Sequence, residues 1–240
     1  MDRQFGRIPS SIDERDWHLE DFIPEKPSFR IGQEAKWDFP GTPLDQGNSS
    51  HCVGFSMAHF GINLPTFTAY TNEEAHELYY KCKEIDGDPK RENGTTIRSA
   101  AKVLQDIGAI NNYAFARDMD TIRWWLINKG PLIVGTIWSE EMMTPDEEGK
   151  LDISGFVLGG HAYLLNEWCK DGYVGIKNSW GKQWGNNGKA YIAVEDFKTL
   201  FLYGGEALAA VENEHYKIKK DCLLIRLVKQ IIGLFRKDKI

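Results

Sequence analysis

The chain has 240 residues, of which 42% are hydrophobic and 12% aromatic, and a formal net charge of −6. This size and composition allow a sizeable core in one domain or in two lobes that share an interface, and they exclude a largely disordered chain. The acidic balance gives no general reason to expect nucleic acid as a partner. No apolar run is long enough to cross a bilayer.

Residues 1–37 combine many charges with several prolines and predict an extended arm that packs on the domain after it. The charged N-terminus is not followed by an apolar run, so the sequence shows no secretory signal. From this we expect a cytoplasmic location.

Helical patterns dominate the first half after the arm. A small and apolar run without proline from Cys52 to Phe60 predicts a buried helix, with the Cys52 thiol at the positive end of its dipole. Further helices are expected over residues 72–83 and 96–107, the second with one apolar face and Gly108 at its end. These segments predict a helical lobe at about 45–125.

The second half changes to short β-rich runs, which are typical of strands. They cover residues 131–138, 161–168, 173–177 and 189–194. They predict a small antiparallel, barrel-like sheet in a second lobe at about 126–213, and the acidic segment 140–149 is expected to be an exposed loop. The two lobes together predict an α+β domain over residues 38–213.

The last segment, residues 214–240, places lysines and arginines around apolar residues at helical spacing. The pattern predicts a basic amphipathic helix on an otherwise acidic protein. Such a helix suits a membrane surface or a protein partner bound through residues 215–240, or docking on the chain's own domain.

Cys52 has, in other segments, the partners that a thiol nucleophile needs. A cysteine attacks a carbonyl only as the thiolate, so it needs a base, a group that orients the base, and a donor for the oxyanion. His161, Asn178 and Gln46 are candidates for these roles, and Cys52 and His161 are expected to rest as an ion pair. Plainer roles remain open for each. Cys52 could be a buried apolar thiol, His161 a structural histidine, the segment at Asn178 a turn, and Gln46 a surface residue.

The order Gln46, Cys52, His161, Asn178, together with the run Asn-Ser-Trp-Gly-Lys-Gln-Trp-Gly-Asn-Asn-Gly at 178–188, resembles the papain family of cysteine peptidases. The similarity covers the chain from about Asp38 to Val211. It implies a papain-like α+β fold, in which the active-site cleft lies between a helical lobe and a β lobe, and it implies no cofactor. The sequence itself shows no metal-ligand spacing.

The resemblance also implies supporting roles. Trp180 would shield the histidine–asparagine hydrogen bond from water. Trp184 would form the floor of the cleft on the leaving-group side, or would have only a packing role in the core. Gly94 and Thr95 resemble the glycine-bearing wall of the substrate groove, and Gly160 lets another chain approach closely. The family's second wall glycine is here Thr95, which we expect to narrow the groove. The family otherwise implies an apolar substrate side chain next to the scissile residue.

Ser49 and Glu206 stand where secreted relatives of the family carry disulfide cysteines, which favours an intracellular setting. Only 51 residues precede Cys52, so the family's long pro-region does not fit, and residues 8–17 resemble the start of compact bacterial and phage members.

The expected function is cleavage of peptide bonds in a polypeptide substrate through a thioester intermediate. One alternative is a catalytically silent peptide-binding or partner-binding protein on the same fold. Another is a transpeptidase or ligase that passes the thioester to an amine.

Overall fold

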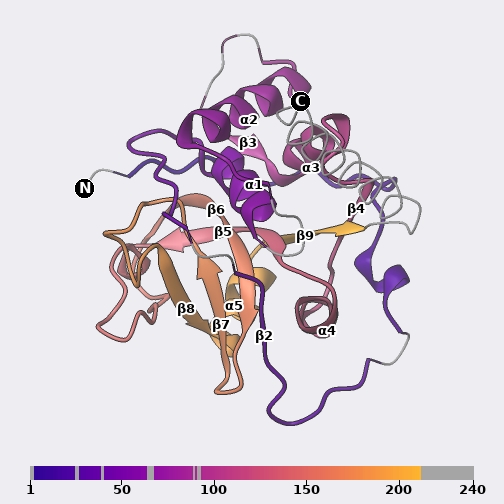
Figure 1. Cartoon of the computed structure of the whole chain (residues 1–240), viewed down its shortest axis with the longest axis vertical. Coiled ribbons are helices and arrows are strands. Elements are labelled where there is room, and N and C mark those ends of the chain that lie inside the picture. The colour runs from indigo at the N-terminus through magenta and orange to yellow at the C-terminus, as the bar shows by residue number, and fades with distance from the viewer. Residues whose placement is uncertain are drawn as a thin grey trace, which may run out of the picture.

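The computed structural model describes residues 3–24, 27–38, 41–63, 68–88, 90 and 93–211. The predicted tail helix at 214–240 lies outside these residues. Within them, α1, α2 and α3 gather in one lobe, and an antiparallel sheet forms the other together with α4 and α5 (Figure 1), which confirms the predicted α+β fold class. No helix in these ranges is both long enough and apolar enough to cross a membrane.

The helical lobe contains α1 (Cys52–Ile62), α2 (Asn72–Ile85) and α3 (Ile97–Asp106), close to the predicted ranges. Helix α1 is buried from its first residue to its tenth, as its apolar composition predicts. Helix α2 begins with a capping box, in which Thr71 Oγ1 accepts from the backbone N–H of Glu74 (3.2 Å) and the Glu74 carboxylate accepts from that of Thr71 (2.7 Å).

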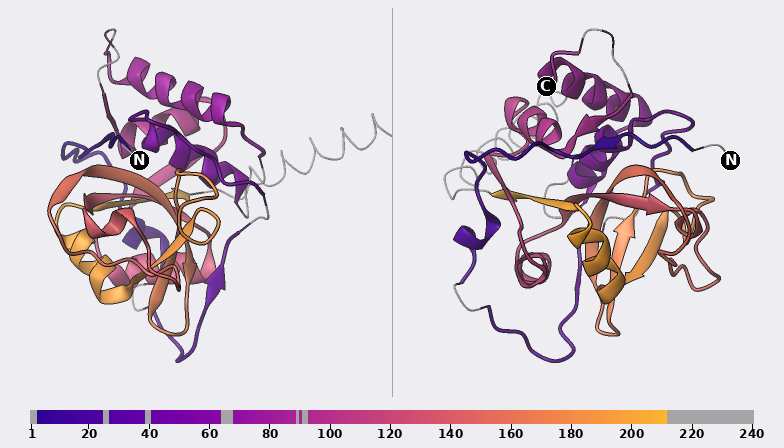
Figure 2. Two further views of the ribbon diagram at one scale, coloured as in Figure 1. Left: turned by 90° about the vertical axis from the view of Figure 1, so that its left-hand side faces the viewer. Right: turned by 180° about the vertical axis from the view of Figure 1, so that it is seen from behind.

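The large sheet has the strand order β4-β9-β5-β6-β7-β8, and a short strand, β2, pairs with β6. Its strands are β2 (Ala35–Lys36), β4 (Asn112–Phe115), β5 (Leu132–Ser139), β6 (Val157–Trp168), β7 (Tyr173–Lys177), β8 (Lys189–Ala193) and β9 (Glu206–Val211). All pairings in it are antiparallel, as expected, and the sheet curls around the core of its lobe in the left view of Figure 2.

Several elements carried no clear sequence signal. They are β2, β4, β9, the helices α4 (Met119–Asn128) and α5 (Val194–Leu202), and the 3-10 turns η1 (Leu19–Phe22) and η2 (Glu141–Met143). Turn η2 falls in the segment predicted to be an exposed loop. That prediction is wrong for Met142, which is fully buried in the core of the sheet lobe.

Central strands of the sheet are buried on both faces, because each face meets a different core. On β5, Leu132 and Val134 belong to the core of the sheet lobe, whereas Ile133 faces the core built around α1. On β6, Tyr163 and Ala162 divide in the same way. This alternation is the period of two expected for a strand. The residues of the second set face α1, which packs directly on β5 and β6.

The N-terminal arm runs between the two lobes (Figure 2, right view). Its strand β1 (Arg7–Ile8) pairs in parallel with β3 (Thr95–Thr96) in a separate two-stranded sheet. Gly6 and Arg7 are buried, so this part of the arm lies inside the molecule.

Replacing Gly54 by alanine should destabilise the helical lobe. A Cβ at this position of α1 would lie 2.4 Å from the carbonyl oxygen of Ala75 and 2.7 Å from the backbone nitrogen of Tyr79, both on α2. Forcing these helices apart should lower the free energy of unfolding by about 1–3 kcal/mol, measured by denaturant titration. Gly41→Ala is the control, because no described atom lies within 4 Å of its added Cβ. Equal stabilities would contradict the close approach of α1 and α2.

Candidate active site

Residues from three separate segments meet where the lobes join. Cys52 is the first residue of α1, His161 lies within β6, and Asn178 directly follows β7. The Cys52 thiol is hydrogen-bonded by the backbone of Ala162, the residue after His161. The fold therefore brings together the predicted nucleophile, base and orienting residue.

The hydrogen bond between His161 and Asn178 sets the tautomer of the histidine. His161 Nε2 lies 2.7 Å from Asn178 Oδ1, an oxygen that also accepts from the backbone N–H of Ser179 at 2.8 Å. An amide oxygen only accepts, so Nε2 carries the ring hydrogen and Nδ1 is left with a lone pair. Nδ1 is buried and has no hydrogen-bond partner among the described residues, so it is free to take a proton.

Aromatic rings enclose His161. The ring centroids of Trp138 and Trp180 lie 4.8 and 4.9 Å from that of the imidazole, and Trp180 is 1% exposed. These rings keep water from the hydrogen bond between His161 and Asn178, the role expected of Trp180. Trp138 makes an equally close contact that sequence reasoning missed, since only the pairing of β5 with β6 places it there.

Gln46 is held by the segment that carries Asn178. Its Oε1 accepts from the Ser179 hydroxyl at 2.6 Å, and its backbone N–H donates to the Ser179 carbonyl at 2.8 Å. With its oxygen engaged, the side-chain NH₂ group points into the groove, where it donates to the carbonyl oxygens of Ser49 and, at 3.1 Å, of Gln4. Ser179 is thus a positioning residue that sequence reasoning did not single out.

The arm fills the space above these residues. Phe5 packs edge-on against His161, with the ring centroids 5.9 Å apart, and the backbone of Gly6 hydrogen-bonds the Cys52 thiol. The Gly6 carbonyl accepts from the backbone N–H of Thr95 at 2.9 Å. The arm therefore covers the thiol and the imidazole and lies against the predicted substrate wall.

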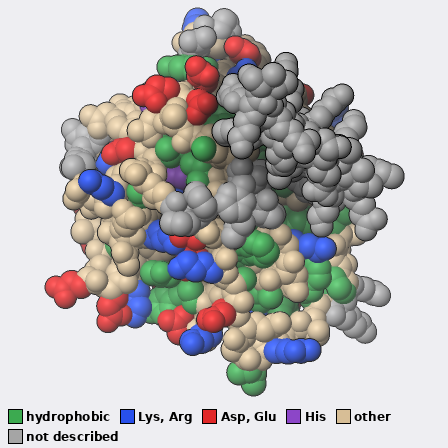
Figure 3. Space-filling view, in the orientation of Figure 1, with side chains coloured by type: hydrophobic (Ala, Val, Ile, Leu, Met, Phe, Trp, Pro, Cys, Tyr) green, Lys and Arg blue, Asp and Glu red, His purple; other side chains and the backbone are tan. Residues whose placement is uncertain are grey.

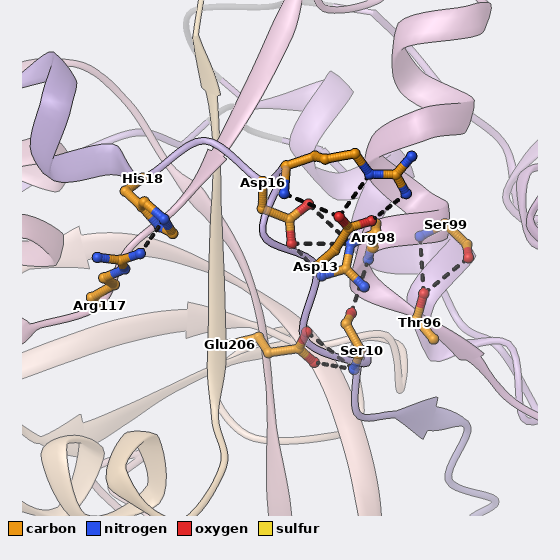
Figure 4. Close-up of polar contacts among 10 residues, drawn as sticks. Ser10, Asp13, Asp16, His18, Thr96, Arg98, Ser99, Arg117 and Glu206 are labelled. Atoms are coloured by element: carbon orange, nitrogen blue, oxygen red, sulfur yellow. Dashed lines mark hydrogen bonds and ion pairs between the residues drawn. The ribbon is translucent and has the colours of Figure 1, made fainter.

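Salt bridges and hydrogen bonds fasten the arm on both sides of the thiol. Arg3 pairs with Asp45 at 2.7 Å, and Arg7 pairs with Glu206 at 2.5 Å. Farther along, Arg98 of α3 donates from Nε to the Asp16 carboxylate at 3.0 Å (Figure 4).

Burial decides the ionisation of the closed site. It raises the pKa of the Cys52 thiol to about 11, although backbone hydrogen bonds from Ala162 and Gly6 act in the opposite direction. It lowers the pKa of His161 to about 4, against the effect of the hydrogen bond to Asn178. Both groups are therefore neutral at pH 7 while the arm is in place, because desolvation disfavours the charged forms. The expected ion pair is not the state of this closed site.

The four residues expected to bind substrate all line the path of the arm. A Cβ at Gly94 would meet the Ile8 side chain at 2.9 Å, and one at Gly160 would meet the Arg7 carbonyl oxygen at 2.2 Å. Trp184 is buried but lines a cavity of about 740 Å³ beside Arg3.

Thr95 does not narrow the groove as expected. Its hydroxyl donates to the Asp86 carboxylate at 2.7 Å, so the side chain turns toward the end of α2. Its backbone, and not its hydroxyl, pairs with the arm.

Within the described ranges, no group of three or more His, Cys, Asp or Glu side chains is arranged to hold a metal ion. Cys52, Cys82 and Cys169 are free thiols. On the face shown in Figure 3, acidic and basic side chains are interspersed.

Solved structures of papain-family cysteine proteases share this fold. Xylellain from Xylella fastidiosa aligns with a TM-score of 0.65 over 88% of this chain and 97% of its own, at 16% identity. The fold is that of papain-like cysteine proteases. Procathepsin B S9 from Trypanosoma congolense aligns over 88% of this chain and 87% of its own, with a TM-score of 0.61 and 13% identity. Digestive procathepsin L 3 from the larval midgut of Tenebrio molitor aligns over 88% of this chain and 76% of its own, with a TM-score of 0.56 and 15% identity.

No protein-family model and no curated protein sequence matches the chain. At identities this low, the structural likeness establishes the papain-like fold alone.

Gly6→Ala should raise the reactivity of Cys52. A Cβ at Gly6 would lie 1.7 Å from the Ser50 carbonyl oxygen, and a terminal arm can move away more easily than the start of a buried helix. Water would then reach the thiol and lower its pKa. We expect alkylation of Cys52 by iodoacetamide at pH 7, followed by peptide mass mapping, to become about tenfold faster or more. Gly41→Ala should keep the wild-type rate, and the half-buried Cys169 is an internal reference. An unchanged rate in folded Gly6→Ala protein would contradict a closed site.

The wild-type thiol should also show an alkaline pH profile. Thiolate is the reactive form, and it predominates only above the thiol pKa. The alkylation rate of Cys52 should therefore rise with pH through neutrality and level off near a pKa of about 11. A plateau already reached near pH 5 would show that an ion pair exists beneath the arm.

Proposed function

We propose that the protein is a cysteine endopeptidase whose nucleophile is Cys52. The observation that carries the proposal is the geometry around His161. Its Nε2 lies 2.7 Å from Asn178 Oδ1, and its Nδ1 has no hydrogen-bond partner among the described residues. The next residue along the chain, Ala162, contacts the Cys52 thiol through its backbone. This is the arrangement of nucleophile, base and orienting group that acyl transfer by a thiol needs.

The first half of the reaction forms a thioester. Nδ1 of His161 removes the proton from the Cys52 thiol, and the sulfur attacks the carbonyl carbon of the substrate. The tetrahedral intermediate then collapses, the C–N bond breaks, and the imidazolium gives its proton to the leaving amine. Asn178 holds the ring in one orientation throughout.

The second half releases the acid. Nδ1 of His161 takes a proton from a water molecule, the resulting hydroxide attacks the thioester carbon, and the sulfur leaves and regains the proton. The Gln46 NH₂ group stabilises the oxyanion in both halves. It now donates to the carbonyl oxygen of Gln4, so it is already directed at a backbone carbonyl in the groove.

A polypeptide is the substrate that the groove suits. The arm lies there as an extended strand paired with β3, so the groove accepts main chain through backbone hydrogen bonds. In the groove, the arm runs from Arg3, beside Trp180 and Trp184, to Ile8, beside Gly94. If Trp184 floors the leaving-group side, the arm runs opposite to a substrate and has to leave before cleavage.

Labelling with a peptidyl epoxide tests the proposal. The Gly6→Ala protein should gain the mass of one reagent molecule, because the thiolate opens the epoxide ring, whereas Gly6→Ala/Cys52→Ala should gain none. With a peptide substrate, Gly6→Ala/Gln46→Ala should show a kcat lower by about 10²–10³-fold, since one oxyanion donor is lost. Circular dichroism of each variant checks folding.

The same experiment separates the alternatives. Products whose combined mass exceeds that of the substrate by one water establish hydrolysis, and joined fragments would indicate a ligase. A Gly6→Ala protein that forms no adduct and cleaves nothing, yet binds peptides, would be a non-catalytic peptide-binding protein.

A further inference from the structure

The side chain of Arg7 occupies a pocket beside the active-site histidine. It is 2% exposed, although it belongs to an N-terminal arm. Gly135 and Ile97 form a wall of this pocket, where a Cβ at Gly135 would lie 2.8 Å from Arg7 Nε and 3.1 Å from Ile97 Cγ1. At the entrance, the Arg7 carbonyl oxygen would lie 2.2 Å from a Cβ at Gly160, the residue before His161.

The floor of the pocket presents only hydrogen-bond acceptors to Arg7. Glu206 Oε2 accepts from Arg7 Nη2 at 2.5 Å and from Nε at 3.1 Å, and the Gly204 carbonyl accepts from Nη2 at 2.7 Å. The Glu206 side chain is 15% exposed. Its two oxygens also face the backbone N–H of Ser10 at 3.2 Å (Figure 4), another group of the arm.

Among the residues that the structure describes, Arg7 is the cation that pairs with Glu206. The main partner of Arg98 is Asp16, which raises the Arg98 pKa, and Glu206 acts on Arg98 in the same direction as the last of the causes. When the arm leaves, Glu206 loses both Arg7 and the N–H of Ser10. A carboxylate without its Arg7 partner then remains at the base of an empty pocket.

The pocket holds the side chain of the residue adjacent to the one that lies at the Cys52 thiol. Gly6 lies on Cys52, and Arg7 is its neighbour on the side of the Gly94–Thr95 wall, away from Trp184. A substrate whose scissile residue lies at the thiol would therefore place the adjacent side chain in the same pocket.

We infer that Glu206 makes this pocket selective for a basic side chain, so that the enzyme prefers substrates with arginine next to the scissile residue. The inference rests on the proposed peptidase function and names its substrate class. It replaces the expectation of an apolar side chain at that position. Arg7 is then the internal occupant of the specificity pocket, and Glu206 is the specificity-determining residue.

The selectivity follows from desolvation. A substrate guanidinium restores the charge-assisted hydrogen bonds to Glu206 and Gly204 that Arg7 makes now. A leucine side chain would fill the space but leave the carboxylate buried and unpaired, which disfavours binding strongly. Lysine offers a single charged nitrogen instead of the Nε and Nη2 pair, so it should rank between arginine and leucine.

Paired peptides test the inference in the full-length Gly6→Ala protein, in which the arm is displaced. Two fluorogenic peptides differ only in arginine or leucine next to the scissile residue. We expect kcat/KM to be about tenfold or more higher for the arginine peptide. Adding Glu206→Gln should abolish this ratio mainly by lowering kcat/KM for the arginine peptide. Glu195→Gln, an exposed acid on α5, should leave the ratio unchanged.

Binding provides a readout that needs no catalysis. In Gly6→Ala/Cys52→Ala protein, fluorescence anisotropy should show about tenfold or more tighter binding of the labelled arginine peptide, and Glu206→Gln should remove the difference. Equal affinities for the two peptides, or a preference for arginine that persists in Glu206→Gln, would overturn the inference. Selective binding without cleavage would refute the peptidase while supporting the pocket. Cleavage without selectivity would support the peptidase and refute the pocket.

Discussion

Helix α1 is buried on every side, and the position of the site depends on that burial. A helix that is apolar all round is stable only in an interior, so both lobes have to meet on it. Helix α2 approaches one side closely at Gly54, and β5 and β6 cover another. The first residue of α1 therefore lies at the boundary between the lobes, where Cys52 contacts the backbone beside His161. The sheet then has to bury both of its faces, which explains its apolar central strands.

The same burial sets the chemical state of the site. A thiol and an imidazole that would ionise in water are neutral here, because the arm excludes solvent from both. The arm thus blocks the groove and also weakens the nucleophile. Its contacts within the site depend on glycines, since a side chain on Gly6 or on Gly160 would collide with the neighbouring backbone. Because we expect a single added methyl group to break this arrangement, the covered and open states of the site should be experimentally separable.

Charge holds the arm where packing alone is weak. Arg3 and Arg7 belong to the arm and pair with acids of the two lobes, whereas Asp16 of the arm pairs with Arg98 of α3. In the pair formed by Arg7 and Glu206, the Arg7 side chain is 2% exposed and the Glu206 side chain 15%. A buried acid that needs a cation is costly to leave empty, so the same residue can fasten the arm and select the substrate. Under the inference drawn above, the arm and a substrate would therefore compete for Glu206.

The sequence by itself determined the helices α1 to α3, four strands of the sheet, and the residues Gln46, Cys52, His161 and Asn178. These depend on local patterns, such as an apolar period or a short motif, which neighbouring residues establish together. Only the tertiary structure decided that Gly6 covers the thiol, that Trp138 encloses the histidine, and that Met142 is buried. It also gave Glu206 a partner 199 positions away in Arg7. Contacts of that range leave no periodic signal, and the neutral thiol and imidazole follow from the burial that these contacts create.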